Sequence, residues 1–165
     1  QPIDGKSDQN SFLITVGHAF ETITAPHDLI YLLENDYLHA PGWLSALFGL
    51  YADRPDTEYV SLYDHKDKYF LPMYEGLQSR IVLGADRHWR TAPSTCGSFV
   101  FQRKQLDQDR DVLLSGQPDY RLFQTLVAAR GRTLLTPLPG LSTHAMAGYT
   151  SPGVDWAGQA ARTEV

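Results

Sequence analysis

The stretch DLIYLLENDYLHAPGW, residues 28–43, decides the fold prediction. A run of apolar residues is followed by the acceptor-rich side chains Glu34, Asn35 and Asp36, and then by Pro41. A continuous apolar run of this length is typical of a strand buried on both faces of a parallel sheet. Proline suits the first position of a helix, where its missing N–H costs nothing. The stretch therefore predicts a buried strand, a polar turn and a helix that Pro41 opens.

Composition is that of a soluble globule. The chain has 165 residues, 42% of them hydrophobic and 20% charged, with a formal net charge of -5. A chain of this size suits one domain, and we expect a single domain over residues 1–165, with a loose lead-in at 1–10 and a tail at 151–165. No basic run is present, which argues against a nucleic-acid surface.

The sequence has few features that indicate a cellular compartment or a redox role. Cys96 is the single cysteine, so neither an intramolecular disulfide nor a cysteine-rich zinc module is expected. No apolar stretch approaches the ~20 residues of a membrane span, and nothing is typical of a signal peptide. We therefore expect a cytoplasmic protein without a transmembrane segment, and a homo-oligomer is compatible with the sequence. The chain begins at Gln1 rather than Met, as a processed or truncated chain would.

Periodicity predicts an alternation of helices and strands. Apolar spacing indicates a helix over 11–22, capped by Ser11 or Asn10, and a second helix after Pro41 whose buried side would be Trp43, Leu44, Leu47, Phe48 and Leu50. Further strands are expected at 59–63, 79–83, 87–91, 97–101 and 133–136, and further helices at 103–114 and from Asp119 to Gly131. This order predicts a layered α/β domain with its parallel part at the front.

Three stretches, in this order, resemble a GT-A-fold, family-2-like inverting glycosyltransferase. IYLLENDYLHAPGW resembles the strand that ends in the acidic DxD-type motif, and TCGSFVFQRKQLDQD resembles a small-residue strand that leads into a basic pair. PDYRLFQTLVAARGRTLLTPLPGLSTH resembles the ED-type helix, the passage after it and a downstream histidine. The resemblance implies a three-layer α/β/α fold with a mixed central sheet. It covers residues 29–144.

The sequence departs from that family at three points. Only about one helix precedes the acidic strand, so most of the N-terminal portion that holds the nucleotide base in that family is not seen. The resemblance therefore implies either an N-terminally truncated domain or a reduced donor site. The acidic motif is Glu-Asn-Asp rather than Asp-x-Asp, and Pro118 stands where an acidic residue is usual.

Glu34 and Asp36 are the candidate metal ligands. Loss of a diphosphate leaving group is helped by a divalent cation, and Mn²⁺ or Mg²⁺ takes carboxylate oxygens. In an extended segment residues two apart point to one side, so both carboxylates are expected to converge, at the strand end where α/β sheets bind ligands. The alternative is that Asn35 and Asp36 only turn the chain and cap the next helix. The resemblance implies that His144 completes the metal site; otherwise His144 is an ordinary surface residue.

Asp119 has two interpretations. As an aspartate before an apolar helix it fits an N-cap, whose loss costs ~1 kcal/mol. The resemblance implies that it is the catalytic base, which must lie within ~3 Å of the acceptor hydroxyl. At a helix start we expect its pKa to be lowered by the helix dipole.

Other polar and aromatic residues are candidates for binding substrate. An exposed Trp89 could stack on a sugar, although a core position is the alternative, and the segment from Asp64 to Asp67 is either a solvated turn or part of an acceptor site. The substrate-binding candidates are Asn35, His88, Trp89, Arg90 and Thr95.

The function predicted is a metal-dependent, hexosyltransferase-like glycosyltransferase. It would move a sugar from a nucleotide-sugar donor to the hydroxyl of a glycan or small-molecule acceptor, with inversion. The alternative is a non-catalytic, truncated GT-A-like module that binds a sugar or nucleotide. A metal-dependent hydrolase using Asp36 and His144 is a third and more distant interpretation, because no clustered His/Asp ligand set is visible.

Overall fold

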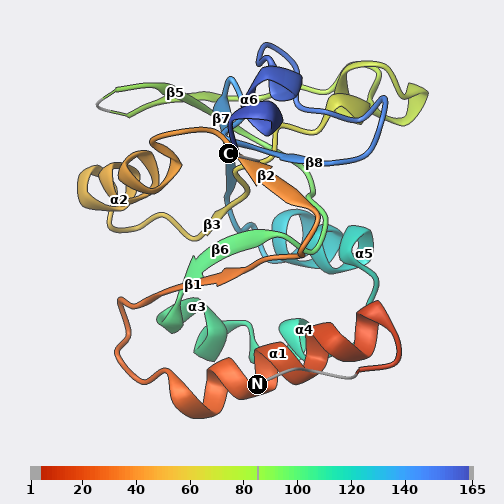
Figure 1. The fold of residues 1–165 in the computed structure, drawn as a ribbon. Helices are drawn as coiled ribbons and strands as arrows, with labels where there is room; N and C mark the ends of the chain where they lie inside the picture. The colour runs from red at the N-terminus through yellow and green to blue at the C-terminus, as the bar shows by residue number, and fades with distance from the viewer. Residues whose placement is uncertain (1–4, 85, 164–165) are drawn as a thin grey trace. The chain divides into compact units, whose positions relative to one another are not determined.

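A computed structural model describes residues 5–84 and 86–163 and shows a mixed α/β protein (Figure 1). The chain forms two compact units, each built from segments that are distant in sequence. The first unit comprises Gln1–Leu33, Glu58–Val60 and Pro93–Leu134, and the second comprises Glu34–Thr57, Ser61–Ala92 and Leu135–Val165.

The first unit combines three strands with short helices. Strands β1 and β3 both pair antiparallel with β6, which lies between them. Its elements are α1 (Asp8–Thr22), β1 (Leu29–Leu32), β3 (Tyr59–Val60), β6 (Phe99–Gln102), α3 (Arg103–Gln108), α4 (Arg110–Leu113), α5 (Asp119–Phe123) and the π-helix η3 (Gln124–Ala129).

Helix α1 begins earlier than the sequence predicts. Ser7 is its N-cap, and the Ser7 hydroxyl accepts the backbone N–H of Asn10 at 3.2 Å. The predicted caps, Ser11 and Asn10, therefore lie inside the helix, as does the end of the expected lead-in. Residues 1–4 of that lead-in are outside the described part. Val16 and Ala19 are buried, as the predicted apolar face requires.

Strand β1 is present where predicted, but it is not part of a parallel sheet. It pairs antiparallel with β6, with Ile30 opposite Phe101 and Leu32 opposite Phe99. Ile30 and Leu32 are buried while Leu29 and Tyr31 are only partly so. This alternation is what one covered face of an antiparallel sheet produces, so the expectation of burial on both faces was wrong.

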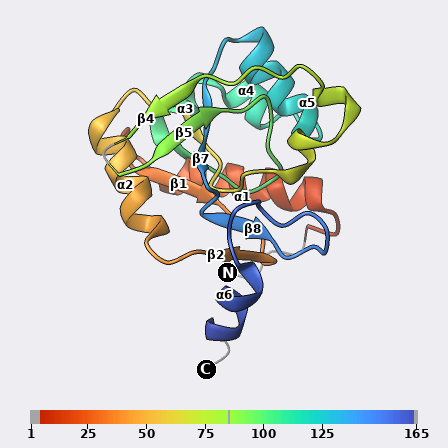
Figure 2. The same cartoon turned by 90° about the horizontal axis from the view of Figure 1, so that it is seen from above.

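The second unit holds two groups of strands. Strand β5 lies between β4 and β7 and pairs antiparallel with both, and β2 pairs with β8 (Figure 2). Tyr63 adds a parallel bridge to Ser142, so the pairing in the chain is mixed. The elements are β2 (Tyr37–His39), α2 (Trp43–Asp53), η1 (Lys66–Tyr69), η2 (Pro72–Tyr74), β4 (Ile81–Leu83), β5 (His88–Thr91), β7 (Leu134–Leu138, beginning with the last residue of the first unit), β8 (Ser142–His144) and α6 (Trp156–Thr163).

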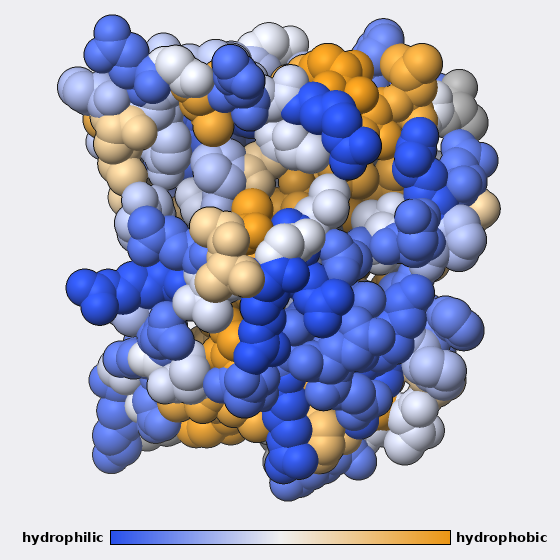
Figure 3. All heavy atoms as spheres, turned by 180° about the vertical axis from the view of Figure 1, so that it is seen from behind, coloured by the Kyte–Doolittle hydropathy of each residue, from blue (hydrophilic) through white to orange (hydrophobic). Residues whose placement is uncertain are grey.

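Helix α2 starts two residues after Pro41 and buries a different face from the one predicted. Gly42 precedes it with a φ of 79°, a conformation that glycine adopts without strain. Leu47 and Leu50 are buried as expected, but Leu44 and Phe48 are exposed. Hydrophobic side chains reach the surface in several places, as the orange areas of Figure 3 show.

The C-terminal segment is more ordered than a tail. It contains α6, and the Trp156 indole N–H donates to the carbonyl of Ser151 at 2.8 Å. Within the described ranges, none of the helices combines the length and the hydrophobicity that crossing a bilayer requires.

Candidate functional site

The β2–β8 ladder brings Asp36 and His144 together across 108 residues of sequence. Asp36 lies in the turn before β2, and His144 is the last residue of β8. Tyr37 is opposite His144 in the register, and the backbone N–H of Ala145 donates to the carbonyl of Asp36 at 2.8 Å. Two backbone segments are thus fixed on either side of the pair.

Asp36 and His144 form a direct hydrogen bond. The distance from His144 Nε2 to Asp36 Oδ2 is 2.6 Å. A carboxylate only accepts, so Nε2 carries the proton in this arrangement. The Asp36 side chain is 52% exposed and that of His144 is 24% exposed, which leaves the pair open to a ligand from solvent.

Glu34 and Asp36 do not lie in the extended segment from which their convergence was predicted. Asn35 and Asp36 occupy a turn, and Glu34, Asn35 and Asp36 are all exposed. Within residues 5–84 and 86–163, no three His, Cys, Asp or Glu side chains are grouped closely enough to hold a metal ion. Asp36 and His144 together offer two ligands, and their role at a metal stays a prediction.

Aromatic rings pack against the imidazole of His144. The Tyr37 ring stacks on the imidazole with 5.3 Å between centroids and 16° between planes. The Tyr63 ring packs edge-on against the Tyr37 ring, with 5.7 Å between centroids. The Tyr63 ring also packs against the His65 ring, with 3.9 Å between centroids. This packing fixes the plane of the His144 ring and thereby the direction of Nε2.

Asp64 and His65 are buried, so for these two residues the interpretation as a solvated turn was wrong, whereas Lys66 is exposed and Asp67 is partly exposed. Lys68, just after the segment, is buried as well. Burial holds the pKa of His65 well below its ordinary value of 6.5, and the positive charges of Lys68 and Arg90 lower it further, with a smaller contribution from His144. His65 is therefore neutral in the folded protein near neutral pH.

A buried ion pair explains the position of Asp64. Arg90 donates to Asp64 Oδ1 from its Nη2 atom at 2.6 Å and from its Nε atom at 3.2 Å. The second carboxylate oxygen, Oδ2, accepts the hydroxyl of Tyr69 at 2.7 Å. Arg90, a predicted substrate ligand, is thus committed to an internal partner.

The remaining predicted substrate ligands are scattered. Trp89 is fully buried in β5, which confirms the core alternative and excludes sugar stacking in this structure. His88, at the start of β5, is exposed and stays a candidate. Thr95 is buried in the first unit.

Asp119 is the first residue of α5 in the first unit, and it is not an N-cap. Pro118 occupies the cap position, and no side chain there bonds to the helix. Burial raises the pKa of Asp119 above its ordinary value; the backbone N–H of Gly97 opposes this and the charge of Asp8 adds to it. The expected lowering was wrong because desolvation of the carboxyl outweighs the dipole of its helix, which α5 and η3 form together.

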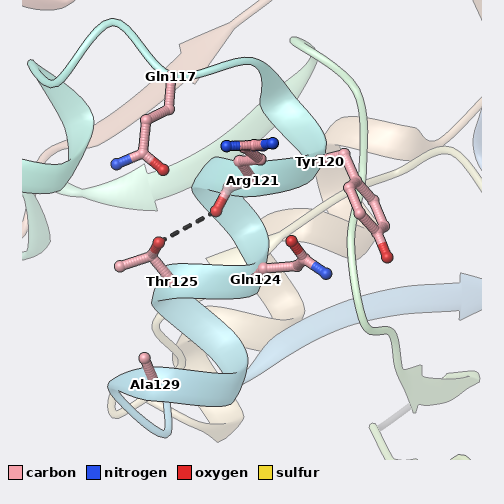
Figure 4. Close-up of a pocket in the computed structure, with 6 residues that line it drawn as sticks. All are labelled: Gln117, Tyr120, Arg121, Gln124, Thr125 and Ala129. Carbon is pink, nitrogen blue, oxygen red and sulfur yellow. Dashed lines mark hydrogen bonds between the residues drawn. The ribbon is translucent and has the colours of Figure 1, made fainter.

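The first unit also has an open pocket that the sequence did not predict. It has a volume of about 530 Å³ and lies on the surface of α5 and η3 (Figure 4). The Thr125 hydroxyl donates to the carbonyl of Arg121 at 3.1 Å across its wall. Its lining residues are Gln117, Tyr120, Arg121, Gln124, Thr125 and Ala129. These amides, hydroxyls and one guanidinium can bind polar groups, but they include no carboxylate or imidazole.

Comparison of the chain with protein families, with curated proteins and with solved structures finds no match.

Proposed function

We propose that this chain is a metal-dependent glycosyltransferase of GT-A-like fold that moves a sugar from a nucleotide-sugar donor to an acceptor hydroxyl with inversion. The observation that supports this most strongly is the contact between Asp36 and His144. The resemblance assigned these two residues to one metal site, and they meet although they are distant in sequence.

Asp36 and His144 would hold the cation, with one carboxylate and one imidazole as ligands. Asp36 Oδ2 and His144 Nε2 lie 2.6 Å apart, close enough to face one ion. Substrate phosphates and waters would supply the other ligands. When bound, the cation would neutralise charge on the diphosphate leaving group.

Protein groups have two further roles in the proposal. Asp36 and His144 orient the donor diphosphate, and ligation by His144 Nε2 would require the tautomer whose proton is on Nδ1. Asp119 accepts the proton of the acceptor hydroxyl. Its raised pKa brings it closer to the operating pH than an exposed aspartate, which suits a general base.

Calorimetry tests the proposal. Mn²⁺ is titrated into the protein with and without UDP, GDP or CDP, comparing wild type, Asp36→Ala and the control Asp28→Ala, which removes an exposed carboxylate at the other end of β1. We expect diphosphate affinity to depend on Mn²⁺ in wild type and Asp28→Ala and to be lost in Asp36→Ala. Nucleotide binding indifferent to both metal and Asp36 would instead support the non-catalytic binding module.

A further inference from the structure

Three exposed aromatic side chains of the second unit lie on segments that are joined to the Asp36–His144 pair. Tyr69 is 57% exposed, Phe70 is 53% exposed and Tyr149 is also exposed. The Phe70 and Tyr149 rings lie 6.3 Å apart at 51°, so each keeps a face open. We call these three residues the aromatic surface. Met73 and Met146, which are exposed as well, are on the same two segments.

Tyr69 is held rigidly in spite of its exposure. Its hydroxyl donates to the buried carboxylate of Asp64 at 2.7 Å. The guanidinium of Arg90, which pairs with the same carboxylate, lies 5.4 Å from the centre of the Tyr69 ring. A buried ion pair contributes little net stability. Here it fixes an exposed ring in advance, which lowers the entropy cost of binding a ligand to that ring.

The loop that carries Tyr149 is tied to the candidate site at both ends. The backbone N–H of Ala145 donates to the Asp36 carbonyl at 2.8 Å, and that of Ser151 donates to the Thr143 hydroxyl at 2.9 Å. In addition, the hydroxyl of Tyr63, whose ring packs on Tyr37, donates to the carbonyl of Tyr149. These bonds connect the backbone of the loop that carries Tyr149 to the residues around the Asp36–His144 pair.

We propose that Tyr69, Phe70 and Tyr149 form a stacking subsite for the pyranose rings of a carbohydrate acceptor. This inference rests on the proposed function. A pyranose offers a flat face of C–H groups, which matches the exposed aromatic faces of these residues. Arg90, whose guanidinium lies against the Tyr69 ring, is neutralised by Asp64. The surface thus suits an uncharged sugar.

Saturation-transfer NMR with soluble trisaccharides tests this subsite in EDTA and without a donor. The probes are cellotriose, maltotriose, laminaritriose and chitotriose. We expect at least one to bind wild type and to lose about tenfold in affinity, ~1.4 kcal/mol, in Phe70→Ala and in Tyr149→Ala. Phe48→Ala is the matched control, since Phe48 is an aromatic residue of α2 that is 56% exposed. Binding should be unchanged in that variant.

Two results would overturn the inference. One is that none of the four trisaccharides binds wild type. This result overturns the inference even where Phe70 is found to bind detergent micelles. The other is equal trisaccharide binding by Phe70→Ala, Tyr149→Ala and Phe48→Ala. The assay needs neither metal nor donor, so its result does not depend on whether the proposed transferase activity exists. Conversely, Mn²⁺-dependent transfer with an unaltered acceptor KM in Phe70→Ala and Tyr149→Ala would refute the subsite alone.

Discussion

The ion pair between Asp64 and Arg90 should behave as a strongly coupled unit. The Asp64 side chain is 1% exposed and that of Arg90 is 7% exposed, with two hydrogen bonds to one carboxylate oxygen. Removing one partner leaves the other charge buried, which typically costs about 3–5 kcal/mol. We expect Asp64→Leu to lower the free energy of unfolding by that amount. Arg90→Met should cost nearer the lower end, because Tyr69 still donates to the carboxylate.

The single variants and the double variant together form a double-mutant cycle, and the double variant is its decisive measurement. Replacing both charges with apolar side chains leaves no buried ion, and such replacements are often neutral or stabilising. Asp64→Leu combined with Arg90→Met should therefore lie within about 1 kcal/mol of wild type. The two single costs minus the cost of the double variant then give a coupling free energy of about 5 kcal/mol or more.

Urea unfolding followed by tryptophan fluorescence measures this cycle in the relevant unit. The chain has three tryptophans, Trp43, Trp89 and Trp156, and all belong to the second unit, as the ion pair does. Additive single-variant effects in the double variant, or a cost of Asp64→Leu below about 1 kcal/mol, would refute the coupling and with it the rigid support inferred for Tyr69.

Three further predictions concern individual groups. Because the pKa of His65 is lowered on folding, the unfolded state binds more protons than the folded state below about pH 6.5. The second unit should therefore lose stability as pH falls through that value, by at most about 1.36 kcal/mol per pH unit. His65→Gln should flatten this pH dependence, which urea unfolding measures. Asp109 is fully buried and bonded to two arginines and a tyrosine hydroxyl, so Asp109→Ala should lower the free energy of unfolding, measured by circular dichroism, by about 3 kcal/mol. Asp111→Ala, at an exposed carboxylate, should leave that free energy nearly unchanged. Asp119→Asn should preserve the fold and abolish transfer, and measurable turnover in this variant removes Asp119 from the mechanism.

The periodic elements could be predicted from the sequence, but the ladder that forms the candidate site could not. Apolar spacing placed α1, β1 and the helix from Asp119 to within a few residues. Strands β2 and β8 have only three residues each and no clear alternation, and their pairing joins positions more than 100 residues apart. The resemblance, rather than periodicity, suggested that Asp36 and His144 meet.

Burial of charged groups was the main source of error. Asp64 and Lys68 stand in a polar stretch that composition assigns to solvent, yet Asp64 finds its partner 26 residues later in Arg90. Sequence distance gives no sign of such a partner. The pKa of Asp119 was misjudged for the same reason, because the dipole of its own helix is visible in the sequence and desolvation by distant segments is not.

The most direct test of the central claim is pulsed electron paramagnetic resonance of Mn²⁺ bound to protein labelled with ¹⁵N at histidine. If Asp36 and His144 hold one cation, the spectrum should show hyperfine coupling to a directly bound imidazole nitrogen, and His144→Gln should abolish that coupling. Bound Mn²⁺ without nitrogen coupling, or coupling that persists in His144→Gln, would contradict the proposed metal site.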